Sequence, residues 1–430
     1  MPSLGVASRA ERLVYRIAGL PVALSGLLLG SSSGDPADPL QAAFVWRYWH
    51  PIGAGEWSEL LGGLIAWPVA LVVGSLWFTI RNGRRIRQRS GKTIHAQFLD
   101  QLRLYFSDGV LAPWYYIFSL YEDGGRERAR GYLQRFETKP CLFLLLKRRR
   151  GSPLTDKKRF AEYCATRGVR CVENLMHFDG RSPPRGLPER NLFVKPTKGR
   201  GGKGAERWDK VGRGIFSAPN GEHCTGDELL ATLVERSRRE PLVVQPRLEP
   251  HRDLAAVTAG ALPTVRIVTC LNEHGDPEVI GAVFRMSIGR NVTVDNFHAG
   301  GIAANVELDT GRLSRATNMG SDARLGWLSS HPDTGAKIEG RPLPLWADAK
   351  ALAIAAHRHF DDRVVVGWDI AILDDGPIVI EGNGNPDLDI LQRFMRTGFR
   401  HQRFGELLGH HLKDCVPQVP DGFAREAFRP

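Results

Sequence analysis

A lysine followed by closely spaced glycines lies near the middle of the chain, and together they could hold an anion. Residues 191–204 read NLFVKPTKGRGGKG, in which a short apolar run leads into Lys195. Glycine lets backbone amides approach an anion closely, and lysine adds a positive charge. This combination is typical of phosphate binding. The glycines are Gly199, Gly201, Gly202 and Gly204.

Three familiar motifs fit this stretch only in part. Its GxGxxG spacing matches a dinucleotide site, but residues 205–212 have no apolar helical face and read as a returning strand. A P-loop requires Ser or Thr where Gly204 stands. HRDL at 251–254 resembles the catalytic loop of a kinase, but Thr258 replaces the metal-binding Asn and no DFG follows. We therefore expect a glycine-rich hairpin over phosphates; the alternative for this stretch alone is a flexible surface turn.

A second polar group, nearer the C-terminus, is typical of a magnesium site. Residues 364–373 and 377–381 flank a DDG turn and predict a β-hairpin. The hairpin places Asp369 within one strand and Glu381 at the end of the next, with Asn383 just beyond. Carboxylate and amide oxygens are ligands for Mg²⁺. Asp369 lies in an apolar run, where an unpaired carboxylate is costly, and a metal offers one resolution. The alternative is an ordinary strand aspartate followed by a turn.

Length, cysteine content and charge limit the function classes. The 430 residues suffice for two or three domains and a large core. The six cysteines are scattered without a CxxC pair, which favours a reducing compartment and argues against a disulfide framework or a zinc site. The net charge of +11 favours anionic partners. Because this charge is spread along the chain, nucleic acid is not indicated.

Residues 1–90 differ in composition from the rest. Residues 17–30 are apolar but short for a membrane span, whereas residues 60–80 contain no charge and precede five arginines between positions 81 and 89. This pattern predicts a spanning helix with its arginines on the cytoplasmic side. The alternative is a buried helix of a soluble domain, which the glycines and the proline in the run also permit.

The remaining elements follow from apolar periodicity and capping residues. We expect helices at 113–121, from 155 or 156 to 168, at 226–239 and at 345–360. Strands are expected at 141–146, 169–172, 192–194, 242–248, 264–271 and 278–287. In the strand at 264–271, Thr264, Arg266 and Thr269 are expected to be partly exposed on one side, with Arg285 on the antiparallel partner strand.

With these motifs in their order, the sequence resembles the ATP-grasp superfamily, and most closely its sugar-transfer-associated group. The resemblance covers roughly residues 90–400. It rests on Asp156-Lys157 at a helix start, FVKPTKGRGGKG at 193–204, Val244-Gln245, LPTVRIVT at 262–269, DNFHAGG at 295–301, GWDIAI at 367–372 and IEGN at 380–383.

The resemblance implies an α+β fold in which two lobes clasp ATP between antiparallel sheets. We expect a hydrophobic helical region at 1–90, a helical linker with a first strand at 91–150, the ATP-grasp catalytic domain at 151–410, and a C-terminal tail at 411–430. The catalytic domain is expected in the cytoplasm, anchored to the inner membrane by residues 60–80 if these residues span it.

The resemblance also implies roles for individual residues. Lys195 and Lys157 would contact the ATP phosphates, although sequence does not separate Lys157 from Lys158, and the glycine loop would cover them. Adenine would lie against Val244, Gln245 and Leu248; the family usually has an acidic residue where Gln245 stands. Two magnesium ions would be bound by Asp369, Glu381 and Asn383, with Glu381 bridging.

The chemistry expected is activation of a carboxylate to an acylphosphate, with ADP formed, followed by attack of an amine or another nucleophile. Arg266 and Arg285 are the candidates for contacts with the substrate carboxylate or the oxyanion. Thr264, Asn296 and His298 are the candidates for substrate binding. The resemblance associates the acceptor with cell-surface saccharides. Two rival functions are phosphoryl transfer to a hydroxyl and nucleotide binding without catalysis.

Overall fold

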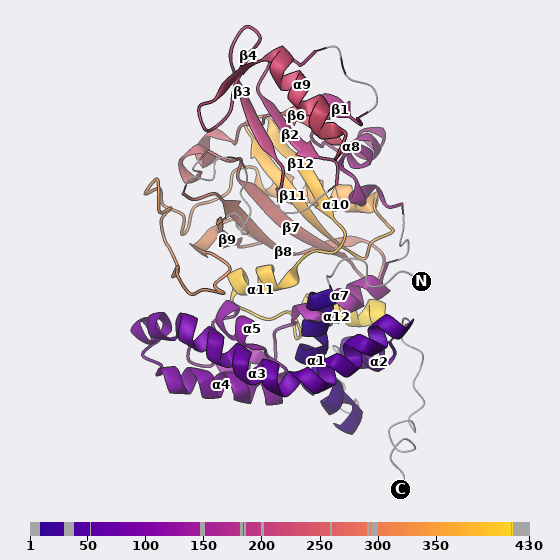
Figure 1. Ribbon diagram of the computed structural model, residues 1–430, viewed down its shortest axis with the longest axis vertical. Helices are drawn as coiled ribbons and strands as arrows, with labels where there is room; N and C mark the ends of the chain where they lie inside the picture. Colours follow the sequence, from indigo (N-terminus) through magenta and orange to yellow (C-terminus); the bar gives the residue numbers. More distant parts are fainter. Residues whose placement is uncertain are drawn as a thin grey trace.

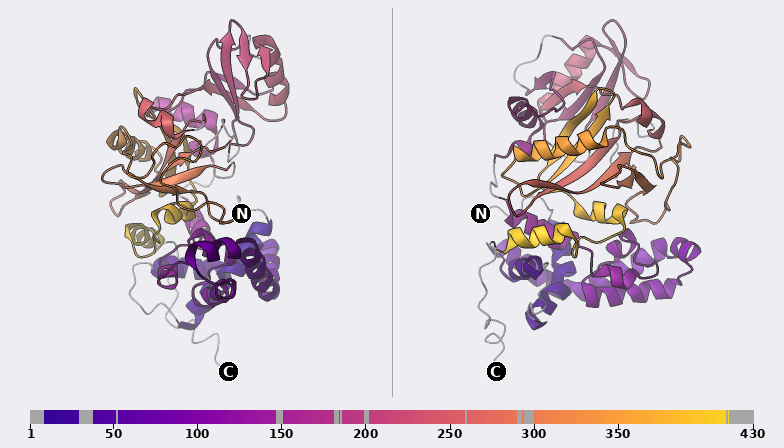
Figure 2. Two further views of the ribbon diagram at one scale, coloured as in Figure 1. Left: turned by 90° about the vertical axis from the view of Figure 1, so that its left-hand side faces the viewer. Right: turned by 180° about the vertical axis from the view of Figure 1, so that it is seen from behind.

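The computed structural model describes residues 9–29, 38–51, 53–146, 151–180, 184, 186–198, 202–258, 260–289, 293, 300–413 and 415. These residues form three tiers (Figure 1): a layer of helices, a sheet above it, and a second sheet at the far end. Both turned views show the same order (Figure 2). Mixed helices and antiparallel sheets confirm the predicted α+β class.

The helical layer comes from the N-terminal third of the chain. Its longest member is α3, which carries Pro68 inside it and is long and apolar enough to cross a membrane by length and composition. α3 packs against α1, α4 and α5. The helices are α1 (Arg9–Leu29), α2 (Asp38–Trp49), α3 (Gly53–Ser90), α4 (Ile94–Asp108), α5 (Ala112–Ile117), α6 (Gly125–Ala129) and α7 (Arg135–Leu144).

The first lobe is a small sheet covered by one helix. The described strands have the order β1-β6-β2-β3-β4-β5 and pair antiparallel. Leu229 and Leu233 of α9 pack on Leu192, Val194 and the other apolar side chains of the sheet. The elements are β1 (Met176–Phe178), β2 (Leu192–Pro196), β3 (Glu206–Gly212), β4 (Ile215–Ser217), β5 (His223–Thr225), α9 (Gly226–Ser237) and β6 (Leu242–Pro246).

The second lobe is built on a larger sheet of order β10-β9-β8-β7-β11-β12. α10 (Trp346–Arg358) and α8 (Lys157–Thr166) contribute to its core, where Trp368 is fully buried. Asp156 caps α8 by accepting from the amides of Lys158 and Arg159. The strands are β7 (Thr264–Leu271), β8 (Pro277–Met286), β9 (Ile302–Val306), β10 (Leu313–Thr317), β11 (Val365–Leu373) and β12 (Gly376–Asn383).

The helical layer and the second lobe share one apolar core. α11 (Leu388–Met395) and α12 (Arg403–Leu412) lie between them (Figure 1). Phe44 of α2 and Phe136 of α7 belong to the same buried cluster as Leu391 of α11 and Val268 of β7. Short 3₁₀ turns lie at Pro153–Thr155 and Arg252–Val257. The division at residue 90 stays a prediction, and residues on both sides of it pack together.

Three local predictions are wrong. Residues 141–146 are not a strand, because α7 begins at Arg135 and runs through the apolar run to Leu144. Residues 169–172 form only an isolated bridge from Cys171 to Val379. Thr264 and Thr269 are both buried and not partly exposed. Thr269 accepts a hydrogen bond from the indole of Trp368, in the core that also holds Val265 and Ile267.

Candidate functional site

A cleft of about 890 Å³ lies between the two lobes and extends to α7 of the helical layer. Its walls carry lysines and arginines together with a smaller number of carboxylates. The charged side chains that line it from both lobes include Lys157, Lys195, Arg266, Arg285, Asp369 and Glu381. The lysines at and before the glycine-rich stretch and the carboxylates of the C-terminal hairpin therefore line the same cavity.

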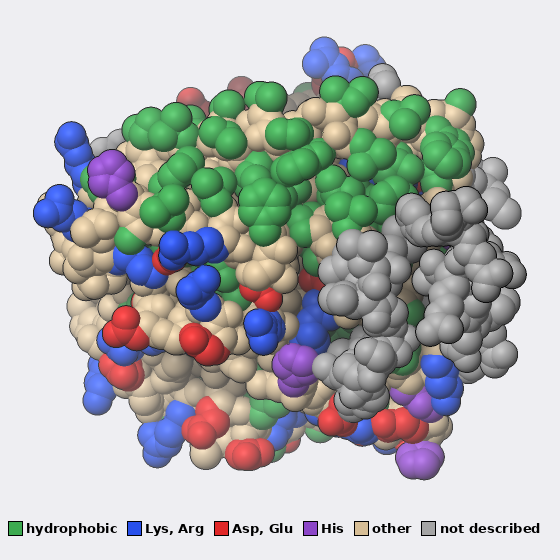
Figure 3. Space-filling view, turned by 90° about the horizontal axis from the view of Figure 1, so that it is seen from below, with side chains coloured by type: hydrophobic (Ala, Val, Ile, Leu, Met, Phe, Trp, Pro, Cys, Tyr) green, Lys and Arg blue, Asp and Glu red, His purple; other side chains and the backbone are tan. Residues whose placement is uncertain are grey.

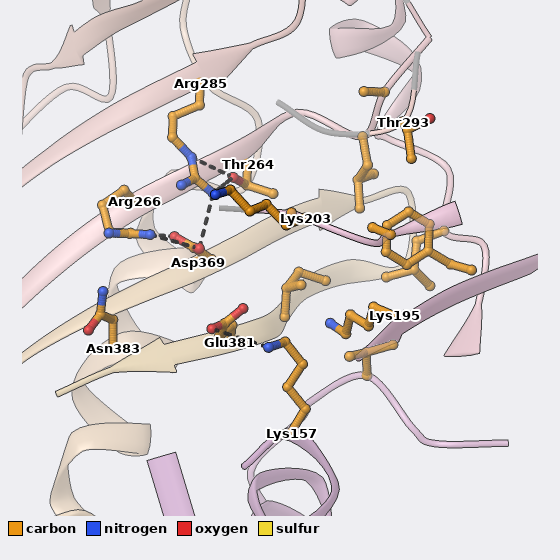
Figure 4. A pocket seen from close by; sticks show the side chains of 18 of the residues that line it. Lys157, Lys195, Lys203, Thr264, Arg266, Arg285, Thr293, Asp369, Glu381 and Asn383 are labelled. Carbon is orange, nitrogen blue, oxygen red and sulfur yellow. Dashed lines mark hydrogen bonds and ion pairs between the residues drawn. The ribbon is translucent and has the colours of Figure 1, made fainter. Parts of the chain in front are cut away.

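Strand register places three charged residues side by side. Arg266 of β7 pairs with Asp369 of β11, and Asp369 pairs with Glu381 of β12. Residues directly opposite on antiparallel strands project from the same face of the sheet. Thr264 lies two residues from Arg266, on the same face, and pairs with Arg285 of β8. Four neighbouring strands thus supply one polar row on the cleft side (Figure 4).

Asp369 is held by two arginines. Its carboxylate forms ion pairs with Arg266, whose Nη2 lies 2.9 Å from Oδ2, and with Arg285 at 3.1 Å. Arg285 Nε also donates to Thr264 Oγ1 at 3.0 Å. Burial alone would raise the pKa of Asp369, but the two guanidinium groups outweigh it and lower that pKa to about 2. The two arginines therefore supply the counter-charge for this buried carboxylate; its role as a metal ligand stays a prediction.

Two lysines face Glu381, Lys157 from the start of α8 and Lys195 from β2 (Figure 4). Lys157 Nζ lies 3.9 Å from Glu381 Oε1. Lys195 is 7% exposed, and burial lowers its pKa to about 8 although Glu381 raises it. Lys158 instead pairs with Glu162 on the exposed side of α8. The geometry therefore distinguishes the two lysines that the sequence does not separate, because Lys157 lines the cleft and Lys158 faces solvent.

The described end of the glycine-rich stretch, residues 202–204, forms a turn that leads into β3. Gly202 and Gly204 have positive φ values of 69° and 72°, which glycine adopts at little cost. Arg236 donates to the carbonyl of Gly204. Four of the predicted site residues lie outside the described residues: Gly199, Gly201, Asn296 and His298.

The proposed adenine contacts divide between cleft and core. Gln245 and Leu248 line the cleft. The side-chain Nε2 of Gln245 donates to Asn174 Oδ1 at 2.9 Å. Val244 is fully buried in the first lobe, and its carbonyl accepts from the amide of Leu175 at 2.8 Å. Within β6, the end of the strand at Gln245 and Pro246 is therefore the part that a ligand in the cleft can contact.

Several residues that line the cleft were missed from sequence. Arg135 and Lys139 reach it from α7, and Lys203 reaches it from the glycine turn. Lys139 Nζ donates to the carbonyls of Asn385 and Pro386 at 2.7 and 3.1 Å and pairs with Asp387. Their spacing puts Arg135 and Lys139 on one side of α7, but only the packing of α7 against the segment at 385–387 brings that side to the cleft.

Asp389 is a further unpredicted group in the cleft. It is 5% exposed, and its Oδ1 has no hydrogen-bond partner within the described part of the chain. Burial, together with the charge of Asp387, raises the pKa of Asp389.

Comparison with known proteins identifies the architecture. A family model described as "Sugar-transfer associated ATP-grasp" matches residues 148–405, which is more than half of the chain. The chain belongs to this family. A search of curated proteins gave no match. The predicted resemblance is thus confirmed over the region that builds the ATP-grasp cleft.

Solved structures give more distant similarities. D-alanine–D-alanine ligase from Bacillus anthracis is 11% identical with a TM-score of 0.35, over 61% of this chain and 68% of that chain. L-amino acid ligase from Bacillus licheniformis is 12% identical with a TM-score of 0.36, over 68% and 53%. N5-carboxyaminoimidazole synthase from Aspergillus clavatus is 11% identical with a TM-score of 0.31, over 55% and 46%.

The ATP-grasp cleft contains oxygen ligands suited to a hard cation. No cluster of three or more His, Cys, Asp or Glu side chains suited to a metal occurs in the described regions. Magnesium, however, commonly takes one or two carboxylates and completes its shell with phosphates and water. Glu381 and Asn383 line the cleft and are partly exposed, whereas the carboxylate of Asp369 is engaged by arginines. The donor set fits magnesium best at Glu381 and Asn383.

Proposed function

We propose that the protein binds ATP in this cleft and uses it to activate a carboxylate as an acylphosphate, with release of ADP. The observation that carries the proposal is the polar row of Arg266, Asp369 and Glu381, which faces Lys157 and Lys195 across the cleft. Membership of an ATP-grasp family supports ATP as the nucleotide. Lysines that can reach the phosphates and a carboxylate that can hold magnesium are what a phosphoryl transfer aided by magnesium requires.

The nucleotide would lie across the opening between the lobes. The base is assigned to the end of β6, at Gln245 and Leu248, and the phosphates to Lys157, Lys195 and the glycine turn. We assign the metal ligands to Glu381 and Asn383, and to Asp369 where it can be released from its arginines; two magnesium ions, with Glu381 bridging, remain the proposed stoichiometry. Bound magnesium would neutralise phosphate charge.

Arg266 and Arg285 would orient the substrate carboxylate, with Thr264 fixing Arg285. A carboxylate oxygen attacks the γ-phosphorus, the bond to the β-phosphate oxygen breaks, and ADP leaves. The nucleophile then attacks the acyl carbon, and phosphate departs with the former carboxylate oxygen. Asp389 is the candidate for taking the proton released by an amine nucleophile, because it lines the cleft and its Oδ1 has no hydrogen-bond partner among the described residues.

The acceptor is proposed to be linked to saccharide modification at the cell surface, a link supported only by the description of the family. The catalytic lobes are proposed to lie in the cytoplasm, with α3 as their anchor at the inner membrane. α3 is long and apolar enough for such a role, by length and composition. The partners are then ATP, a carboxylate substrate and a nucleophilic acceptor.

The full chain with ATP, magnesium and a panel of amino acids and amino sugars tests this proposal. Formation of ADP that depends on both a carboxylate and a nucleophile is expected. A carboxylate labelled with heavy oxygen should pass its label to the released phosphate. Label retained in a phosphorylated product would instead support the second candidate, phosphoryl transfer to a hydroxyl. Binding of ATP without any turnover would support a nucleotide-binding module.

A further inference from the structure

One side of α3 leaves large apolar side chains exposed to solvent. Leu61, Ile65, Val69, Val73, Trp77 and Ile80 are all exposed, and they recur every three or four residues. This spacing puts them on one stripe of the helix. Leu99 and Phe106 of the neighbouring α4 are also exposed. We call these eight side chains the apolar face.

The apolar face is large and lies away from both sheets. Ile65, Val69 and Ile80 are 80%, 68% and 72% exposed. The view from below shows hydrophobic side chains gathered in a continuous band over the helical layer, bordered by charged side chains, several of them Lys or Arg (Figure 3). A soluble monomer rarely leaves so continuous an apolar surface, so a partner is expected to cover it.

The opposite side of α3 is fixed within the helical layer. Leu60, Leu71 and Thr79 are buried there. Gln101 of α4 donates to Thr79 Oγ1 at 2.7 Å. Asn82 donates to the carbonyl of Ser321, in the second lobe, at 3.1 Å. These bonds keep α3 from turning its apolar face toward the core.

The charged side chains of α3 indicate which kind of partner would cover the apolar face. Its two acidic residues, Glu56 and Glu59, are buried and paired with Arg47 and Arg12 at 2.7 and 2.9 Å. All its arginines, by contrast, are exposed; they are Arg81, Arg84, Arg85, Arg87 and Arg89. The exposed charge next to the apolar face is therefore positive, which suits anionic lipid headgroups.

We propose that the apolar face docks onto a bilayer that contains anionic lipid, with α3 lying in the plane of the interface and not crossing it. Trp57 and Trp77 are exposed toward the two ends of the stripe. Tryptophan favours the headgroup region, so both ends can lie at the same depth. The cleft, on the other side of the helical layer, then remains open to water.

A crossing orientation is disfavoured by the neighbour of α3. α4 runs alongside its apolar segment, since Tyr105 stacks on Trp67 and Gln101 bonds to Thr79. α4 carries the exposed Arg103 and the paired Asp100. If α3 crossed with the layer intact, these charges would enter the hydrocarbon, which is costly. If α3 crossed alone, its bonds to α4 and to Ser321 would break.

Flotation of the full chain with lipid vesicles tests the docking. We expect binding to vesicles of phosphatidylcholine mixed with phosphatidylglycerol, and weaker binding to phosphatidylcholine alone. The triple variant Ile65→Ser, Val69→Ser, Ile80→Ser should bind roughly 10- to 100-fold more weakly, because it loses the three most exposed side chains of the apolar face. Val211→Ser, an exposed aliphatic position on β3, is the matched control and should bind as the wild type does.

A charge variant separates headgroup attraction from apolar insertion. Arg84→Gln with Arg87→Gln should remove most of the preference for phosphatidylglycerol, whereas Arg213→Gln, between β3 and β4, should not. Failure of the wild type to float, or equal flotation of the triple variant, would overturn the proposal. So would a lipid-free dimer that the triple variant separates, because a second copy would then cover the face.

The in-plane orientation has its own test. Gly55→Cys and Gln88→Cys place a thiol at exposed positions near the two ends of α3. Both should react with a membrane-impermeant maleimide from the same side of sealed membrane vesicles, the side that also supplies ATP, with the wild type as the labelling baseline. Labelling from opposite sides would show that α3 crosses. Neither experiment measures turnover, so failure here is distinct from failure of the proposed reaction.

Discussion

Asp369 and Glu381 stand directly opposite each other on β11 and β12, yet their carboxylates have different partners. Asp369 is enclosed by Arg266 and Arg285, whereas Glu381 is 39% exposed and faces Lys157 at 3.9 Å. The first carboxylate thus fixes the arginines of the row, and the second is available to a ligand. Different consequences are expected when each is changed.

Asp369→Asn should lower the stability of the fold. It leaves Arg266 and Arg285 without their buried counter-charge, and losing one partner of such a pair costs about 3–5 kcal/mol. Because the pKa of Asp369 is lowered to about 2, its pairing contributes fully above pH of about 4 and is lost as the pH falls toward 2. Urea unfolding at several pH values checks both points, with Asp375→Asn on the exposed hairpin turn as control. Equal stability of the two variants at pH 7 would contradict the role.

Lys157→Ala and Lys158→Ala should differ sharply in ATP turnover. Lys157 lines the cleft, while Lys158 pairs with Glu162 outside it. Loss of a phosphate contact made in the transition state should reduce kcat/KM by about 100-fold or more, whereas the neighbouring change should have little effect. Steady-state kinetics with matched unfolding temperatures decides the matter. Similar rates for the two variants would remove Lys157 from the phosphate site.

Binding of ATP should weaken above pH 8. The pKa of Lys195 is lowered to about 8, so the free protein loses this positive charge as the pH rises. By pH 9 the Kd for Mg·ATP should increase by about tenfold, since roughly one lysine in ten remains protonated. Lys195→Arg keeps its charge and should show a flat profile over the same range. Titration calorimetry at pH 7 and pH 9 gives the comparison, and a flat wild-type profile would contradict the assignment.

Glu381→Gln should impair magnesium-dependent ATP binding more than Asn383→Ala. A bridging carboxylate brings charge to both ions, whereas an amide contributes one neutral oxygen. Calorimetric titration of the two variants with Mg·ATP and with ATP in chelator measures the difference. If both variants lose the same affinity, Glu381 does not bridge.

The sheets were predictable because their strands carry their own signals. Alternation and the DDG turn predicted β7, β11 and β12, and the hairpin brought Asp369 near Glu381. The pairing of β7 with β11, which adds Arg266 to the same row, comes from the structure. The error in α7 has a physical cause, since the apolar run at 141–146 has no polar positions that would reveal a helical period. Arg135, Lys139 and Asp389 could not be found from sequence, because their place in the cleft depends on packing between segments about 250 residues apart, as with Lys139 and Asn385.

The hydrogen bonds from Lys139 to the backbone at Asn385 and Pro386 have an evolutionary consequence. They join the helical layer to the segment that directly follows Asn383. The ATP-grasp region is therefore not expected to keep its structure when it is transferred to another chain without α7. Among relatives, residues 139 and 387 are expected to covary, because their side chains form an ion pair, and chimaeras joined at residue 150 should lose the ordered end of β12.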